Sequence, residues 1–135
     1  MGYQTASGTI LLKVPPADVL MFLKDGSNIP KWAVGFADDV RHVAGHRWLA
    51  RKGDREFSID ILSLNNSGLV QYIRDMPDGS RGGASVQLLD APDNGSVLVM
   101  TIPISPTSSA RESVQIVDDE LRQLSLLLED GAIAR

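Results

Sequence analysis

The sequence contains no cysteine, few aromatic residues and no long apolar run. Without cysteine, disulfide bonds, thiolate metal ligands and cysteine nucleophiles are all excluded. Two Trp, two Tyr and three Phe leave a mainly aliphatic core, so any cavity would have apolar walls with few stacking surfaces. No apolar run approaches the ~20 residues of a membrane span, and the N-terminus lacks the basic and apolar regions of a signal peptide. We therefore expect a cytoplasmic protein without membrane insertion.

Positive charge is also scarce, with a formal net charge of −4 and a pI near 5.0. Nucleic-acid binding needs clustered positive charge, so this composition argues against it. Arg41, Arg47, Arg51, Lys52 and Arg55 form only a local concentration, typical of solvated strand edges. With 43% apolar and 22% charged residues, the 135-residue chain is typical of a single globular domain, 1–135, with its core at about 8–130.

The first 33 residues predict one strand and two short helices. Residues 9–14 are rich in branched side chains, as in a strand. Proline favours the first helical position, so Pro15-Pro16 predicts a helix over 17–24, and Gly26 is a candidate left-handed stop. A second short helix is expected over 29–33.

From residue 38 to 104 the pattern indicates an antiparallel meander. Residues typical of tight turns recur every ~9–14 residues, and the runs between them alternate apolar and polar side chains. Gly82-Gly83 is interpreted as part of a turn, because no Lys-Ser/Thr follows as a phosphate loop requires. The turns are Ala44-Gly45, Gly53-Asp54, Asn65-Asn66-Ser67-Gly68, Pro77-Asp78-Gly79 and Pro92-Asp93-Asn94-Gly95, and strands are expected at 47–51, 57–64, 69–74, 84–89 and 97–104, after a first one that ends at Ala44.

The last quarter, about 107–130, predicts one long amphipathic helix. Pro106 precedes it, Ser109 with Glu112 forms a capping box, and Gly131 ends it. Apolar residues then recur at steps of three and four, which places them on one stripe that must pack on the sheet. The stripe consists of Val114, Val117, Leu121, Leu124 and Leu128.

The order of elements resembles a known superfamily. It is carried by Val14-Pro15-Pro16-Ala17-Asp18-Val19-Leu20, Asn28-Ile29-Pro30-Lys31-Trp32-Ala33, Asp75-Met76-Pro77-Asp78-Gly79 and the closing helix. Together these resemble the START/Bet v 1-like superfamily (SRPBCC), which includes polyketide cyclases/dehydrases and lipid-transport proteins. The resemblance implies an α+β helix-grip fold: a seven-stranded curved antiparallel sheet wrapped around the C-terminal helix. Members bind lipids, hormones, polyketides or other apolar ligands, and some use iron centres. This chain lacks the Cys and His for iron, so we expect no metal and no cofactor.

The resemblance also implies an internal cavity between the sheet and the last helix. This hypothesis requires open space between the sheet and Val117, Leu121 and Leu124. The residues expected to line the cavity are Trp32, Phe36, Trp48, Phe57, Ile59, Tyr72, Arg74, Val86, Leu88, Leu98, Met100, Val117, Leu121 and Leu124.

Few residues are candidates for chemistry. His42 and His46 are the only histidines, and a hairpin turn at Ala44-Gly45 would point them to opposite faces, which argues against a shared metal. His46 could act as an acid or base, or simply lie on the surface. Asp60 alternates with core residues and is expected to face solvent.

Tyr72 and Arg74 are two residues apart on one strand and therefore share a face. On the inner face they would offer a hydroxyl and a guanidinium to orient a carboxylate or carbonyl. On the outer face they would form a solvated stripe, and the sequence leaves both open.

Three functions fit these patterns. The first is binding of a small apolar or amphipathic ligand. The second is a cyclase or dehydrase in which Tyr72, Arg74 or His46 polarises a carbonyl. The third is a protein-interaction domain without a ligand, and a homodimer is compatible with each. No convergent catalytic set is visible, so ligand binding is the leading hypothesis.

Overall fold

The structure, a computed structural model, describes residues 4–63, 67–75, 81–104 and 109–129. Several predicted features lie outside these residues: Asn65-Asn66, the Pro77-Asp78-Gly79 turn, Pro106 and the positions just after it, and Gly131.

Seven antiparallel strands form one curved sheet. In chain order they are β1 (Thr5–Leu12), β2 (Asp39–Ala44), β3 (Arg47–Lys52), β4 (Arg55–Ser63), β5 (Leu69–Asp75), β6 (Arg81–Ala91) and β7 (Gly95–Pro103). Their order in the sheet is β1-β7-β6-β5-β4-β3-β2, so the meander β2–β7 is closed by β1 at its far edge. The predicted α+β helix-grip fold is confirmed.

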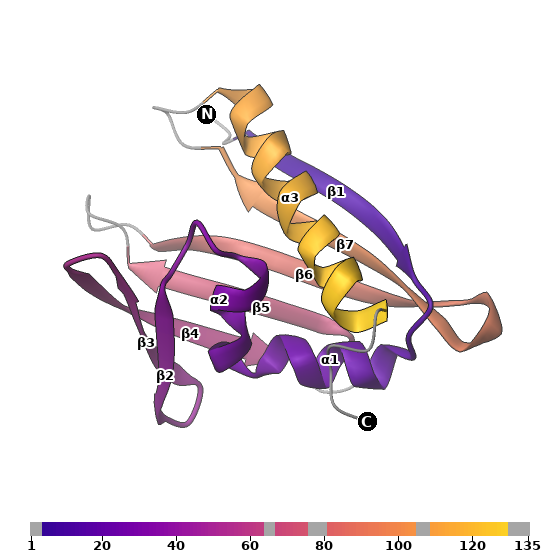
Figure 1. Ribbon diagram of the computed structural model, residues 1–135, viewed down its shortest axis with the longest axis horizontal. Coiled ribbons are helices and arrows are strands. Elements are labelled where there is room, and N and C mark those ends of the chain that lie inside the picture. The colour runs from indigo at the N-terminus through magenta and orange to yellow at the C-terminus, as the bar shows by residue number, and fades with distance from the viewer. Residues whose placement is uncertain (1–3, 64–66, 76–80, 105–108, 130–135) are drawn as a thin grey trace.

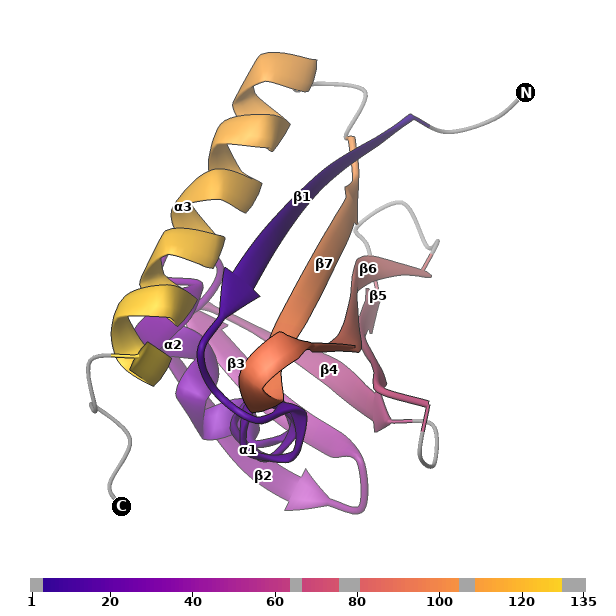
Figure 2. The same ribbon diagram turned by 90° about the vertical axis from the view of Figure 1, so that its right-hand side faces the viewer.

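The helices all lie on one side of the sheet, which curves around them (Figures 1 and 2). They are α1 (Pro16–Lys24), α2 (Ile29–Trp32) and α3 (Ala110–Glu129), with short 3₁₀ turns η1 (Gly26–Asn28) and η2 (Pro92–Asn94). Gly26 does not have the left-handed backbone that we predicted for it. Packing explains the glycine instead, because a Cβ at position 26 would lie 2.6 Å from Cδ2 of Trp48.

Helix α3 begins with the predicted capping box. The backbone N–H of Glu112 donates to Oγ of Ser109 at 3.1 Å, and the hydroxyl of Ser109 donates to Oε1 of Glu112 at 3.3 Å. The stripe prediction was wrong at one position: Val114 is 42% exposed, and Ser113 is buried in its place. At the start of α3 the buried stripe contains Ser113 and not Val114. The reason is spacing, because Ser113 lies four residues before Val117, and Val117 lies four residues before Leu121.

The largest differences from the predicted strand boundaries are at the starts of β1 and β6. β1 begins at Thr5 rather than at residue 9, and Gly8 in it pairs with Met100 of β7. β6 begins at Arg81, so Gly82 and Gly83 lie in a strand and not in a turn. Both stretches contain glycine and few apolar side chains, so their sequences have no strand pattern, and pairing with a neighbouring strand decides their conformation.

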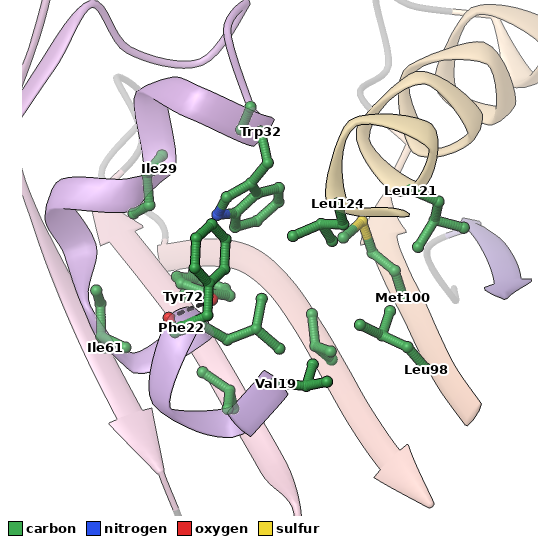
Figure 3. Close-up of a cluster of buried hydrophobic side chains, with 14 of the residues drawn as sticks. Val19, Phe22, Ile29, Trp32, Ile61, Tyr72, Leu98, Met100, Leu121 and Leu124 are labelled. Atoms are coloured by element: carbon green, nitrogen blue, oxygen red, sulfur yellow. Dashed lines mark hydrogen bonds between the residues drawn. The ribbon is translucent and has the colours of Figure 1, made fainter. Parts of the chain in front are cut away.

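The hydrophobic core lies between the sheet and the helices (Figure 3). Side chains of α1 and α2, such as Val19, Phe22 and Trp32, meet Tyr72 and Ile61 of the sheet. Leu98 and Met100 of β7 are fully buried near Leu121 and Leu124 of α3. The layer is therefore closed where α3 lies over β1 and over Leu98 and Met100 of β7, and the site described next lies beside it.

Candidate ligand-binding site

A pocket of about 680 Å³ opens between α2, the sheet and one flank of α3. Three groups of residues line it. From α2 and the segment after it come Ile29, Trp32, Ala33, Val34, Gly35 and Phe36; from the sheet, Ile59, Tyr72, Arg74, Gly83, Ala84, Ile102 and Pro103; and from α3, Ile116, Asp119, Glu120, Arg122 and Gln123.

Small residues on β6 leave this space open. Gly83 and Ala84 line the pocket, and Ala84 is the cross-strand partner of Tyr72. A Cβ at Gly83 would collide with the carbonyl oxygen of Tyr72, so no larger residue fits that strand position as it stands. The β6 part of the pocket floor therefore consists of backbone atoms and the methyl group of Ala84.

Tyr72 lies on the inner face of β5, which decides between the two orientations left open above. Its hydroxyl donates a hydrogen bond of 2.7 Å to the carbonyl oxygen of Leu23 in α1. Burial, and then the negative charge of Glu120, raise the pKa of Tyr72 far above its ordinary value. The phenol therefore stays neutral with its proton engaged, and it tethers α1 to the sheet rather than serving as an acid.

Arg74 shares that inner face and lines the pocket. Its Cζ lies 4.6 Å from the ring centroid of Phe57 and 5.7 Å from that of Phe36, so the two rings hold the guanidinium by cation–π contact. Burial and the nearby charge of Arg55 lower the pKa of Arg74, yet a guanidinium keeps its proton in proteins. Its Nε is buried and has no hydrogen-bond partner among the described residues.

Trp32 provides a second buried donor in the same wall. Its ring packs edge-on against Tyr72 with centroids 5.7 Å apart, and its Nε1 is buried without a partner among the described residues. Native structures leave few buried polar atoms unpaired, and those that remain call for an explanation.

Glu120 is a pocket residue that the sequence analysis missed. Burial, and then the charge of Asp119, raise its pKa to about 7. The only sequence signal is positional: Glu120 follows Ile116 by four residues and Val117 by three, so it flanks the buried stripe. A carboxyl beside such a stripe is common on helices, and the sequence alone does not show that it faces a pocket.

The other charged residues of the rim are solvated. Arg122 lies 4.0 Å from Asp119 one turn away on α3, and both side chains are more than half exposed. Gln115 also donates to Asp119 at 2.9 Å. Arg74 and Glu120 are thus the two partly buried ionisable groups on opposite walls of the pocket.

The predicted cavity residues fall into two groups. Trp32, Phe36, Ile59, Tyr72 and Arg74 are among the residues that line the pocket. The rest lie outside its wall: Trp48 packs on Gly26, Phe57 lies beneath Arg74, and the buried layer contains Val86, Leu88, Leu98, Met100, Val117, Leu121 and Leu124.

The open space therefore lies beside the apolar stripe of α3 and not beneath it. A Cβ at Gly8 would lie 2.8 Å from side-chain atoms of both Val117 and Leu121, so helix and strand are in close contact there. The hypothesis that the cavity lies between the sheet and this stripe needs this correction.

The two histidines have separate partners. Nε2 of His42 lies 2.8 Å from the carbonyl oxygen of Gly45, and its ring packs on Trp48. The hairpin turn falls on Gly45 and His46, one residue later than predicted, because Ala44 pairs with Arg47 after a bulge. His46 is absent from the residues that line the pocket, and no cluster of three or more potential metal ligands occurs in the described ranges.

Asp60 is buried, contrary to the prediction that it faces solvent. It is 5% exposed, although it points away from the helices. Arg47, its cross-strand partner, donates to Oδ1 at 2.9 Å, and Nδ1 of His46 lies 3.2 Å from the same oxygen. Its alternation with core residues on β4 correctly indicates the outer face, but these two longer side chains cover it.

Comparison with solved structures supports the same fold. The chain is 18% identical to the Aha1 dimer protein from Colwellia psychrerythraea, with a TM-score of 0.72 over 95% of this chain and 98% of that one. It is 14% identical to protein MLL2253 from Mesorhizobium loti (TM-score 0.71; 96% and 100% covered). It is 16% identical to DynU16 of the dynemicin biosynthetic locus (TM-score 0.65), covering 94% of this chain and 48% of DynU16.

These likenesses extend to the fold alone, because every identity is below 25%. No family model matches the chain, and no curated protein matches it in sequence. In the described part of the chain, no helix is long and apolar enough to cross a membrane.

Proposed function

We propose that this protein binds a small apolar or amphipathic molecule in the pocket between α2, the sheet and α3. The observation that carries the proposal is the pocket itself, about 680 Å³ in volume with mostly apolar walls and a few polar groups. Ligand sites of ~300–1,000 Å³ with this composition are typical of small-molecule binding proteins. Apolar burial at ~25 cal/mol per Å² would drive binding.

A cavity-filling variant tests the proposal. Nile red, an uncharged apolar dye, is expected to bind the wild type with one site and increased fluorescence. Ala84→Leu places a larger side chain on the pocket floor and should abolish the signal. Ser85→Leu is the matched control, because it adds a leucine at the next residue of β6, on the opposite face of the sheet.

A second variant protects the test against misfolding of Ala84→Leu. Ile116→Trp fills the pocket from α3, where Ile116 is 48% exposed and its replacement disturbs no buried packing. Circular dichroism checks the fold of each variant. Absence of dye binding to the wild type, or equal binding by Ser85→Leu and both filled variants, would overturn the proposal and favour an interaction domain without a ligand.

Native mass spectrometry of the purified protein provides the complementary test. We expect a mass increment from a co-purified small molecule in the wild type, and its loss from Ala84→Leu and Ile116→Trp. The mass of that molecule would give the first information on ligand identity.

A second function is favoured by Glu120. A carboxyl with a pKa of about 7 opposite a guanidinium suits proton transfer to or from a carbonyl substrate, as in a cyclase or dehydrase. Arg74 would polarise the carbonyl and Glu120 would move the proton, whereas Tyr72 has its proton engaged with Leu23. Deuterium exchange α to the carbonyl of 2-decanone measures this, and no acceleration over buffer, or an equal rate with Glu120→Gln, rejects it.

A homodimer is also proposed, since the similar Colwellia protein was solved as a dimer. Sedimentation equilibrium over a range of concentrations decides this, and a constant monomer mass would reject it.

A further inference from the structure

Two buried side-chain polar atoms in the described residues have no hydrogen-bond partner, and both are N–H donors. They are Nε of Arg74 and Nε1 of Trp32, and both residues line the same pocket. A buried donor left unpaired costs about 1–3 kcal/mol, so a ligand that offers an acceptor would recover this free energy. The unpaired polar groups of this wall are therefore donors, whereas the acceptors Asp119, Glu120 and Gln123 lie on α3.

The charges of the pocket walls point the same way. Arg74 remains a cation at all ordinary pH values, and the faces of Phe36 and Phe57 hold it in place. Glu120 is partly desolvated, and a carboxyl can lose its charge by taking up a proton. One wall therefore has a permanent positive charge, and the other has a negative charge that is removable.

The groups around Glu120 leave this carboxyl as the titrating one. From β5 it faces Tyr72, which stays neutral. Arg74 lines the same pocket and stays charged, but the charge that shifts the pKa of Glu120 is that of Asp119. On its own helix the charged neighbours at the pocket are Asp119 and Arg122, which lie 4.0 Å apart at the exposed rim. The pocket residues of α2, β6 and β7 contain no ionisable side chain.

We infer that the ligand has an anionic oxygen headgroup, such as a carboxylate, which binds the guanidinium of Arg74 while Glu120 takes up a proton. This inference rests on the proposed function and specifies the polar end of the same ligand. An anion and an ionised Glu120 in one pocket would repel each other, so binding of the first favours protonation of the second. The anion is thus recognised by charge-assisted hydrogen bonds and its binding is linked to pH.

A series of three probes tests the headgroup. Decanoate, 1-decanol and decyltrimethylammonium have the same ten-carbon chain and differ in charge, and each competes with Nile red at pH 7. Decanoate is expected to bind at least about tenfold more tightly than the ammonium, with the alcohol between them. Arg74→Gln should reduce that preference about tenfold or more. Arg51→Gln is the control, because Arg51 is an exposed arginine of β3 away from the pocket.

Proton uptake gives an independent readout. Calorimetric titration with decanoate in phosphate and in Tris at pH 7.5 should give different apparent enthalpies, corresponding to uptake of a fraction of a proton. From pH 6 to 9 decanoate stays ionised, and its affinity for the wild type should fall about tenfold. Glu120→Gln should bind decanoate with no proton uptake and with constant affinity over this range.

The outcomes separate the two proposals. If Nile red binds but the ammonium competes as well as decanoate, or if Arg74→Gln keeps the preference, the headgroup inference fails and ligand binding stands. Absence of proton uptake in the wild type, or equal uptake by Glu120→Gln, also rejects the inference. If Nile red does not bind at all, the proposed function itself fails.

Discussion

Helix α3 covers the sheet in two different ways along its two sides. On the side toward β1 the contact is closed, with Val117 and Leu121 against Gly8 and with Leu124 buried. On the side toward α2 and β5 the contact is open, and a pocket of about 680 Å³ remains. A single amphipathic helix thus provides core packing on one side and a pocket wall on the other.

The difference depends on what a small residue faces. Gly8 lets the helix approach β1 so closely that side chains of α3 fill the space. Gly83 and Ala84 also lack long side chains, but the helix residues across from them are mainly polar or half-exposed, such as Glu120 and Ile116. Small residues of the sheet therefore allow close packing at Gly8, where apolar side chains of α3 fill the space. At Gly83 and Ala84 they leave a pocket, because the apolar side chains of α3 do not reach that space.

The largest expected difference between the two sides of α3 is in the stability lost when one of its side chains is shortened to alanine. Leu124→Ala removes a fully buried side chain on the closed side and should lower the free energy of unfolding by about 2–5 kcal/mol. Ile116→Ala on the open side should cost less than about 0.5 kcal/mol, because Ile116 is half-exposed, but should weaken Nile red binding. Urea unfolding measures both, and equal losses would contradict the distinction.

Replacing one glycine by alanine on each side of α3 tests the same difference in packing. Gly8→Ala adds a methyl group 2.8 Å from Val117 and Leu121 and should lower stability by about 1–3 kcal/mol through overpacking. Gly35→Ala is the matched change on the open side, where nothing lies within 4 Å of the added Cβ. Thermal unfolding should show a lower Tm for the first variant only, and a stable Gly8→Ala would mean that α3 can move away from β1.

The charge of Glu120 should make the open side sensitive to pH. Its pKa in the folded protein is about 7, above the ordinary 4.5, so ionisation costs stability as pH rises between these values. Glu120→Gln should therefore stabilise the protein by about 2 kcal/mol at pH 8 and by little at pH 5. Urea unfolding at the two pH values measures this gain. An equal gain in stability at both pH values would mean that the effect comes from packing and not from the charge of Glu120.

The smallest expected effect is at Tyr72, whose hydroxyl joins β5 to α1. Tyr72→Phe removes the donor to the carbonyl oxygen of Leu23 and should lower stability by about 1 kcal/mol. Because that hydroxyl is engaged with the backbone, Nile red binding should not change. A loss of binding at unchanged stability would instead show that the hydroxyl contacts the ligand.

Much of the fold could be predicted from local patterns. Turn residues and alternation located most strands of the meander, and Ser109 with Glu112 marked the start of α3. The failures have one cause in common. Gly82 and Gly83 lie in β6 and Gly26 packs under Trp48, because contacts with distant residues decide what each glycine does.

The site was less predictable than the fold. Tyr72 and Arg74 could be paired on one face by their spacing, but only burial shows which face. Glu120 was missed because a glutamate on a helix flank is ordinary until α2 and β5 are seen to line the same pocket. Asp60 was misjudged for the same reason, since Arg47 and His46 bury it from a neighbouring strand and turn.

The apolar stripe of α3 shows how far the sequence alone determines this protein. Periodicity determined that the helix exists and that Val117, Leu121 and Leu124 turn toward the sheet, because helical spacing is a local property. Only the tertiary structure decided that these side chains fill their space and that the pocket opens beside them. The physical reason is that a cavity depends on the distance between elements, and long-range packing sets that distance.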